Sequence, residues 1–356
     1  MTTMNPLPSH VASLKPYQSA RSVRKGDQWL FMDANESPAA SAAAIGPLPP
    51  MNRYPDPTAD GLRDAVAGFY GLDRSRAMMA NGSDELIDLL ARCFVRPGRR
   101  VVTLAPSYGM YRVSAASNGA AMSVARLTAD FKLDGDALVA ALDDADLVFL
   151  CSPNNPTGQV IEPGVVERLA ARFPGVVAVD EAYGEFADAE GVPSSIEFVR
   201  RGVRNLVVLR TFSKAFAAAG IRLGYALAQP AVIDVLLRMK PPYNVNVLTQ
   251  AVGRSLWSQR DIMERNVRGL IAERTRLAAG CRQLGCEVFP SKANFFLLRP
   301  PAGVVAKQLY DELIERFSLV VRRFDGSAQL DGLLRVTVGL PEHNDFLLSS
   351  LRQLLP

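Results

Sequence analysis

Four short apolar runs, each followed by a conspicuous polar residue, constrain the fold of this chain more than any other feature of its sequence. The runs are Val101–Ala105, Asp146–Cys151, Val176–Val179 and Leu206–Leu209, and helix-forming segments separate them. Short runs rich in Val and Leu that alternate with helices are typical of parallel strands covered on both faces. The sequence therefore predicts an α/β fold with a mostly parallel central sheet and helices on both faces.

The polar residues after these runs are Tyr108, Asn155, Asp180 and Lys214. In open parallel sheets, ligands bind at the edge formed by the carboxyl ends of the strands. Asp180 and Lys214 are 34 residues apart, which is the length of one strand–helix–strand repeat. We therefore expect both side chains to point into one crevice at this edge.

The chain divides into three expected parts. Residues 1–40 show little periodicity and predict an N-terminal arm that packs with the small domain, and residues 41–240 predict a large ligand-binding domain. Residues 241–356 predict a smaller α+β domain that closes on it, after a boundary at Lys240-Pro-Pro-Tyr-Asn244. This domain should begin with a long helical span from Leu248 to Leu284, weakened at Gly253 and Gly280.

Composition excludes several classes of function. The net charge is only +4 and the basic residues are scattered, so no basic groove for nucleic acid is expected. With two histidines and four cysteines that form no C-x-x-C pair, neither a metal site nor a Ser-His-Asp triad is expected. No apolar run approaches the roughly 20 residues that span a bilayer, and no secretory signal is visible, which favours the cytoplasm.

Lys214 is one of only seven lysines and follows a strand among Phe and Ala residues. Poor hydration disfavours the charged form of an amine and makes it a usable nucleophile. Ser213 and Arg222 supply a hydroxyl donor and a fixed cation of the kind that hold a phosphate. The segment therefore suggests a covalently held phosphorylated aldehyde, pyridoxal 5'-phosphate, on Lys214. Alone, this pattern is more typical of a surface lysine at a strand end.

The remaining requirements of this cofactor have candidates elsewhere. Asp180 would keep the ring nitrogen protonated, and Tyr108 would cover the ring face. Asn155 and Tyr183 would hydrogen-bond the ring phenolate. A helix expected to start near Ser83, its N-cap, with Asp84 in the first turn, is either a phosphate cradle or simply a well-capped helix.

Three further residues are open to two interpretations. Tyr17, fixed after Pro16, either staples the arm to the body or reaches a ligand. Asn35, in the loop after a short strand, either forms a turn or contacts a ligand. Tyr54, in a Pro-rich loop, either covers the surface or meets a ligand or another subunit.

Several motifs together resemble the pyridoxal phosphate aminotransferases of fold type I. They are Asn154-Asn-Pro-Thr-Gly, Val179-Asp-Glu-Ala-Tyr, Thr211-Phe-Ser-Lys and Arg222-Leu-Gly. Within that group the chain resembles the histidinol-phosphate aminotransferases through Leu14-Lys-Pro-Tyr-Gln-Ser-Ala-Arg, Arg53-Tyr-Pro-Asp, Pro106-Ser-Tyr-Gly-Met-Tyr and Leu334-Arg-Val-Thr-Val-Gly. One departure is Ser83, where that family often has Ala.

The resemblance implies transfer of an amino group between histidinol phosphate and 2-oxoglutarate. It also implies a homodimer in which Tyr54 reaches the cofactor phosphate of the partner subunit. Arg335, with Arg322 nearby, would take the anionic end of each substrate, and Tyr17 would help to close the site. The alternation of residues 319–322 does not decide whether Arg322 or Arg323 points inward.

Three other functions remain open from the sequence. They are an aromatic amino acid aminotransferase, a decarboxylase of the threonine-phosphate type, and a non-catalytic homologue. The presence of Lys214, Asp180 and Arg222 together argues against the last.

Overall fold

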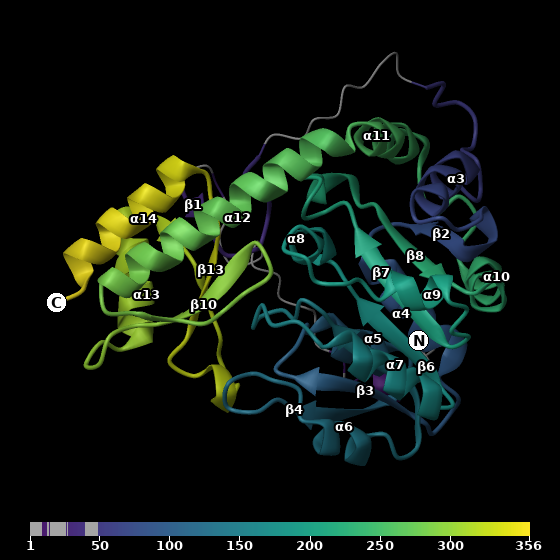
Figure 1. The fold of residues 1–356 in the computed structure, drawn as a ribbon, viewed down its shortest axis with the longest axis horizontal. Helices are drawn as coiled ribbons and strands as arrows, with labels where there is room; N and C mark the ends of the chain where they lie inside the picture. Colours follow the sequence, from purple (N-terminus) through teal and green to yellow (C-terminus); the bar gives the residue numbers. More distant parts are fainter. Residues whose placement is uncertain (1–8, 13, 15–25, 27, 40–48) are drawn as a thin grey trace, which may run out of the picture.

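The computed structural model describes residues 9–12, 14, 26, 28–39 and 49–356. The predicted arm residue Tyr17 lies outside these residues. Within them, the chain forms a large domain around a seven-stranded sheet and a smaller domain, and the helix α12 runs from one to the other (Figure 1).

The seven-stranded sheet has the strand order β2-β8-β7-β6-β5-β3-β4. Only β8 runs antiparallel to its neighbours, so the prediction of a mostly parallel sheet is confirmed. The strands are β2 (Ala77–Ala80), β3 (Arg100–Ala105), β4 (Ala121–Arg126), β5 (Ala145–Cys151), β6 (Val176–Asp180), β7 (Leu206–Thr211) and β8 (Gly224–Ala228).

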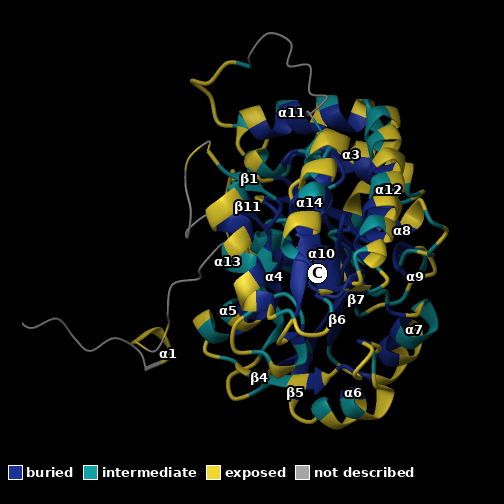
Figure 2. Cartoon of the chain, turned by 90° about the vertical axis from the view of Figure 1, so that its left-hand side faces the viewer, coloured by how far each residue is buried: buried dark blue, intermediate teal, exposed yellow. Residues whose placement is uncertain are grey.

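Successive strand residues face opposite sides of this sheet and enter two separate cores. In β5, Val148 and Leu150 belong to one core while Leu147 and Phe149 belong to the other. All four are fully buried, which explains why the strand reads as an uninterrupted apolar run. Figure 2 shows the buried sheet interior in dark blue and exposed residues on the outer faces of the helices.

Helices cover both faces of the sheet. Buried residues of α4, α5 and α10 enter one core, and those of α3, α6, α7, α8 and α9 enter the other. Their bounds are α3 (Asp60–Phe69), α4 (Ser83–Phe94), α5 (Met110–Ser117), α6 (Gly135–Ala141), α7 (Pro163–Arg172), α8 (Gly184–Asp188), α9 (Ile196–Arg200) and α10 (Pro230–Met239). The short α1 (Ser9–Ala12) contacts α5, and 3₁₀ turns span Arg74–Arg76, Ala219–Ile221 and Ala328–Leu330.

The smaller domain is built on an antiparallel sheet of order β12-β13-β10-β9. Its strands are β9 (Glu287–Val288), β10 (Phe295–Arg299), β12 (Arg322–Arg323) and β13 (Leu334–Thr337), and its helices are α13 (Ala306–Phe317) and α14 (Pro341–Leu354). A parallel pair, β1 (Leu30–Phe31) with β11 (Leu319–Val320), joins the N-terminal segment to this domain. The C-terminal helix α14 begins at Pro341, and proline suits the first helical position.

The helical span after the hinge is interrupted at a different place from the one predicted. The structure has two helices, α11 (Val247–Ser258) and α12 (Arg260–Gln283), which meet at Gln259. Gly253 and Gly280 lie inside them because neighbouring side chains come close. A Cβ on Gly280 would lie 2.7 Å from Leu348 Cδ2, and one on Gly253 would collide with Leu223. These glycines permit close packing rather than a break.

The packing of α11 bears on the domain boundary. Leu256 and Trp257 of α11 belong to the core of the large domain, whereas Leu277 and Cys281, near the end of α12, belong to the core of the small domain. The expected boundary at residues 240/241 would assign α11 to the small domain. We propose instead that the two domains divide within α12.

No helix among the described residues combines the length and apolar character needed to cross a bilayer. All four cysteines are unpaired thiols, and Cys151 is buried at the end of β5, as its position in an apolar run predicts.

Candidate active site

A cavity of about 530 Å³ lies at the carboxyl-terminal edge of the large sheet and is closed on one side by the small domain. It is lined by twelve of the fourteen residues that the sequence singled out. They are Asn35, Ser83, Asp84, Tyr108, Asn155, Asp180, Tyr183, Ser213, Lys214, Arg222, Arg322 and Arg335. Tyr54 does not line this cavity, and Tyr17 lies outside the described residues.

Lys214 lies in this cavity just after β7. Its Nζ donates a hydrogen bond to the Ala34 carbonyl oxygen at 3.2 Å and lies 5.7 Å from the centre of the Tyr183 ring. Among the described residues it forms no ion pair with a carboxylate. Burial, reinforced by the positive charge of Arg335, lowers the pKa of Lys214 to about 8. The amine is therefore neutral, and nucleophilic, in a useful fraction of molecules near neutral pH.

Asp180 ends β6 at the floor of the cavity and is buried. Its Oδ2 accepts a hydrogen bond from the Tyr111 hydroxyl at 2.8 Å, and its Oδ1 accepts one from the Ala182 amide at 3.1 Å. Burial raises the pKa of Asp180 to about 6 although both hydrogen bonds favour the charged form. A cation brought beside this carboxylate would therefore be strongly favoured.

Tyr111 was not among the residues predicted from the sequence. Its ring is fully buried and stacks on Phe149, with centroids 4.8 Å apart and planes 6° from parallel. It also meets the Tyr108 ring edge-on at 5.6 Å. The available signal was its place three residues after Tyr108, on the first turn of α5, which puts both rings on the same side of the helix start.

Tyr183 and Asn35 are held together at the wall nearest the small domain. Asn35 Nδ2 donates to the Tyr183 hydroxyl at 2.9 Å, and both side chains are buried. Asn35 adopts a φ of 53°, which Asn tolerates better than most residues. Its backbone N–H donates a hydrogen bond to Thr337 Oγ1. Asn35 therefore forms a tight turn and also lines the cavity.

The opposite end of the cavity is rich in donors. Arg222 donates to Ser213 Oγ at 3.5 Å and pairs with Asp84 at 3.3 Å, while the Tyr108 hydroxyl donates to Asp84 at 3.1 Å. Ser83 is the first residue of α4, so the amides of this helix start face the same region. The prediction that Ser83 is the N-cap is wrong by one residue. Gly82 occupies that position, because its φ of 80° is open to glycine but strained for serine.

Two arginines come from adjacent strands of the small domain. Arg335 is buried and donates to Asn155 Oδ1 at 2.6 Å and to the Asp33 carbonyl oxygen. Its register partner across β12 and β13 is Arg322, which also lines the cavity. Arg323 instead pairs with Asp325 at 3.0 Å and lies over the Tyr310 ring. Arg322 is therefore the residue that points inward.

Tyr54 lies on the outside of the molecule. It is 80% exposed and stacks on Tyr243, with centroids 4.5 Å apart and planes 12° from parallel. Tyrosine is among the residues that are enriched at protein interfaces relative to the rest of the surface.

Comparison with known proteins agrees with this geometry. Residues 29–351 match the model of the family described as aminotransferase class I and II. The chain belongs to this family. It is 40% identical to the histidinol-phosphate aminotransferase of Parabacteroides distasonis over 349 residues, which cover 97% of this chain and 96% of the relative. It is 36% identical to the histidinol-phosphate aminotransferase of Pyrococcus furiosus, over 97% of both chains.

Solved aminotransferase structures share the fold. The histidinol-phosphate aminotransferase of Sinorhizobium meliloti, solved in complex with pyridoxal-5'-phosphate, superposes with a TM-score of 0.86 at 24% identity and covers 99% of both chains. That of Clostridium acetobutylicum superposes with a TM-score of 0.82 at 23% identity, over 91% of this chain and 98% of the other. The prediction of fold type I is thereby confirmed.

Aminotransferases of this family use pyridoxal 5'-phosphate, and the cavity of this aminotransferase fits that group. The phosphate end requires space beside donors. A Cβ on Gly82 would lie 2.7 Å from Arg222 Nη2, and one on Gly224 would lie 2.6 Å from the Ser83 amide nitrogen, so both glycines keep this end open. The ring end requires a buried carboxylate that favours a neighbouring cation, which Asp180 provides. Among the described residues, no group of acidic, Cys or His side chains is arranged to hold a metal ion.

Proposed function

We propose that this chain is a histidinol-phosphate aminotransferase, which moves an amino group between L-histidinol phosphate and 2-oxoglutarate during histidine biosynthesis. Imidazole acetol phosphate and glutamate form the other pair. The observation that carries the proposal is the identity of 36–40% over 97% of the chain to relatives of that name. The lysine, the carboxylate and the two arginines that such a reaction needs line one cavity.

Pyridoxal phosphate, when bound, supplies an aldehyde that accepts the amino group and a ring that draws electrons from the reacting carbon. The residues of this chain would hold it at four places: its phosphate, its ring nitrogen, its ring oxygen and the face of its ring. The α4 start, Ser213 and Arg222 bind the phosphate, and Asp180 holds the proton on the ring nitrogen. Asn155 and Tyr183 hydrogen-bond the ring oxygen, and Tyr108 covers the ring.

Lys214 then has two tasks in sequence. Its Nζ would hold the cofactor covalently, and as a free amine it would carry a proton between two carbons. A pKa of about 8 suits both tasks, because the amine releases and regains a proton near neutral pH. Tyr111 has no contact with substrate in this scheme and serves to position Asp180.

Arg335 and Arg322 serve both substrates in turn. Histidinol phosphate carries a phosphate but no carboxylate, whereas glutamate carries two carboxylates. A guanidinium binds either anion through two parallel hydrogen bonds. Because Arg335 is hydrogen-bonded to Asn155, the substrate anion would be held next to a residue that also contacts the cofactor ring.

The adjacent arginines on β12 offer a matched test of this role. Arg322→Ala should raise KM about 10- to 100-fold for histidinol phosphate and for glutamate, since hydrogen bonds to charged groups contribute about 1.5–3 kcal/mol. Arg323→Ala, which removes a cation from the same strand but not from the cavity, should change KM less than about twofold. Equal effects of the two substitutions would contradict the assignment.

The substrate is tested by parallel assays of three candidate compounds. The purified holoenzyme would be given histidinol phosphate, phenylalanine and threonine phosphate in parallel, with transamination and carbon dioxide release both measured. We expect transamination of histidinol phosphate at the highest kcat/KM and no carbon dioxide. A preference for phenylalanine would instead make it an aromatic aminotransferase, and carbon dioxide from threonine phosphate would make it a decarboxylase.

The functional unit proposed here is a homodimer, with no nucleic acid or membrane partner. The exposed Tyr54–Tyr243 pair supports an interface at this loop, where Tyr54 would reach the phosphate of the partner's cofactor. Sedimentation equilibrium should then give twice the mass of the chain.

Tyr17 is proposed to close the substrate end of the site. The unpaired cysteines are compatible with the reducing cytoplasm.

A further inference from the structure

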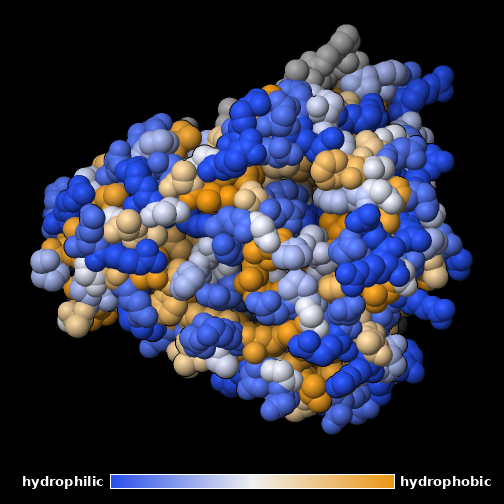
Figure 3. Space-filling view, in the orientation of Figure 1, coloured by the Kyte–Doolittle hydropathy of each residue, from blue (hydrophilic) through white to orange (hydrophobic). Residues whose placement is uncertain are grey.

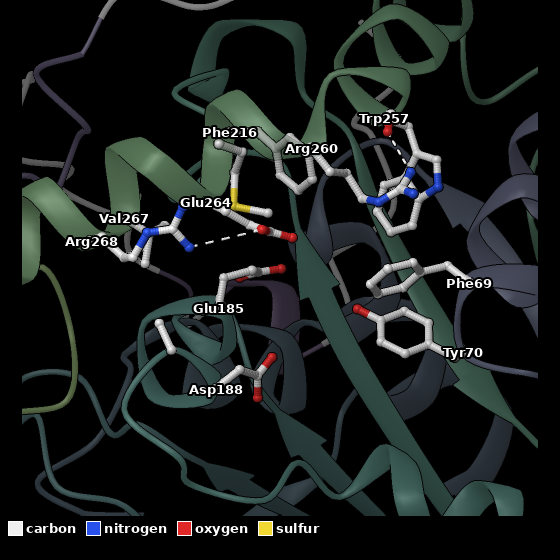
Figure 4. Close-up of a pocket in the computed structure, with 12 residues that line it drawn as sticks. Phe69, Tyr70, Glu185, Asp188, Phe216, Trp257, Arg260, Glu264, Val267 and Arg268 are labelled. Atoms are coloured by element: carbon white, nitrogen blue, oxygen red, sulfur yellow. Dashed lines mark hydrogen bonds and ion pairs between the residues drawn. The ribbon is translucent and has the colours of Figure 1, made fainter.

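A second cavity, of about 290 Å³, lies beneath the start of α12 and shares no lining residue with the candidate active site (Figure 4). It is bounded by α8, by the end of α3 and by the junction of α11 and α12. Figure 3 shows apolar residues gathered in the hollow below α12 on this face of the molecule. The proposed aminotransferase reaction makes no use of this cavity.

Four aromatic rings form one wall of the cavity: Phe69, Tyr70, Phe216 and Trp257. Arg260 already lies over two of them, with its guanidinium carbon 4.6 Å from the Phe69 centroid and 4.9 Å from the Trp257 centroid. Such contacts arise because the electron-rich faces of aromatic rings attract cations. This wall therefore has the chemistry that accommodates a positive charge.

The floor of the cavity holds a carboxylate that is poorly compensated. Glu185 is 8% exposed, and neither of its side-chain oxygens has a hydrogen-bond partner among the described residues. Its nearest cation is the Arg210 guanidinium, 3.4 Å from Oε1, which also binds Glu181 and Asp188 at shorter distances. Figure 4 shows the carboxylates of Glu185 and Glu264 directed toward the space beside the Tyr70 hydroxyl.

The side chains that line the cavity carry a negative excess. They include three carboxylates and two guanidinium groups, so one formal negative charge remains when all five are ionised: Glu185, Asp188, Glu264, Arg260 and Arg268. Arg210, which contacts Glu185 and Asp188, is shared with a further carboxylate, Glu181. Burial raises the pKa of Glu185 to about 7, although the positive charge of Arg210 favours the ionised form.

We propose that this cavity binds a small organic monocation, with its ammonium- or imidazolium-type head against Glu185 and its apolar body among the aromatic rings. The volume admits a ligand of about one ring with a short side chain. Charge complementarity and a buried carboxylate without a hydrogen-bond partner among the described residues select a cation over a neutral or anionic compound of the same shape. Because the ligand would contact both α8 and α12, it would connect the large domain to the helix that leads into the small one.

The test uses benzyltrimethylammonium, whose quaternary nitrogen cannot react with the aldehyde of the cofactor. Calorimetric titration of the holoenzyme should show saturable binding with one site per chain. Benzyl alcohol and phenylacetate, which retain the ring but not the positive charge, should bind at least about tenfold more weakly. Equal binding of the three compounds would overturn the proposal, as would no binding of the cation at millimolar concentration.

Two substitutions locate the site. Glu185→Gln keeps the size of the side chain and removes its charge, and it should weaken binding of the cation about tenfold or more. Ala189→Trp, at the exposed rim, should abolish binding by filling the cavity while every charge is retained. If Glu185→Gln does not fold, Ala189→Trp decides alone. Unchanged affinity in the folded variants would place the cation elsewhere and overturn the proposal.

Two further measurements separate this cavity from the active site. Glu264→Gln serves as the matched control, because Glu264 is half exposed at the rim and lies 4.0 Å from Arg268, so its removal should weaken binding less than about threefold. The cation should not compete with histidinol phosphate or glutamate in the steady-state assay. Competitive inhibition would show that it occupies the active site, and the proposal would then fail independently of the proposed reaction.

Discussion

Two cations that are withdrawn from solvent, Arg210 fully and Lys214 partly, lie close together on the same segment of chain and have opposite environments. Arg210, on β7, is fully buried and pairs with Glu181 at 2.7 Å and with Asp188 at 2.9 Å. Lys214, four residues later, has a single hydrogen bond among the described residues, to a backbone carbonyl oxygen. The environment raises the pKa of Arg210 well above its ordinary value and lowers that of Lys214 to about 8.

This difference shows how one strand supports both structure and chemistry. Carboxylates compensate for the burial of Arg210, which stays charged and ties β7 to the α8 region. Lys214 lacks such compensation, so its charged form is disfavoured and its proton becomes mobile. A side chain that changes its protonation state during a reaction needs a charge that nearby opposite charges do not fully compensate. A buried charged side chain that stabilises the fold needs full compensation.

The largest expected effect comes from removing the uncompensated cation. Lys214→Ala should lower kcat at least about 10³-fold, because both the covalent attachment and the proton carrier are lost. It should also remove the visible absorption band that the bound cofactor produces. Lys292→Ala, which removes a lysine paired with Glu190, should leave kcat within about twofold of the wild type. Near-normal turnover by the Lys214→Ala variant would contradict the proposed role of Lys214.

Removing the compensated cation should act on stability instead. Arg210→Met would leave the carboxylates of Glu181, Glu185 and Asp188 without their counter-ion and should lower the free energy of unfolding by about 3–5 kcal/mol. Urea denaturation would measure this loss. Arg201→Met, which removes an exposed arginine paired with Glu197 and Glu167, should cost less than about 1 kcal/mol. Similar losses in the two variants would contradict the distinction drawn between the cations.

The smallest expected effect is a pH-dependent gain in stability. The pKa of Lys214 in the folded protein, about 8, lies below its ordinary value of 10.5, so the folded state loses the proton first as the pH rises. The stability of the cofactor-free wild type should therefore increase between pH 8 and 10.5. Below pH 8, Lys214→Met should be more stable than the wild type by about 1–3 kcal/mol, and the difference should disappear by about pH 10.5. A difference independent of pH would contradict the lowered pKa.

Much of the fold and of the site was predictable because the signals are local or repetitive. Strands buried on both faces read as apolar runs, and parallel connection brings their carboxyl ends to one edge. Asp180 and Lys214 could therefore be placed together from their spacing alone. The glycines at positions 253 and 280 were misread because intrinsic helix propensity indicates a weak point, whereas close approach of Leu223 and Leu348 is what each position requires.

The sequence by itself determined the parallel sheet, the edge at which its polar residues gather and the family to which the chain belongs, since these follow from periodicity and from motifs within one strand or turn. Only the tertiary structure decided that Arg322 rather than Arg323 faces the cavity, that Tyr111 supports Asp180, and that Glu185 has no hydrogen-bond partner in the part of the chain that the structure describes. The physical reason is that the pKa and role of a charged group depend on which distant residues are packed around it, and local sequence does not contain that information.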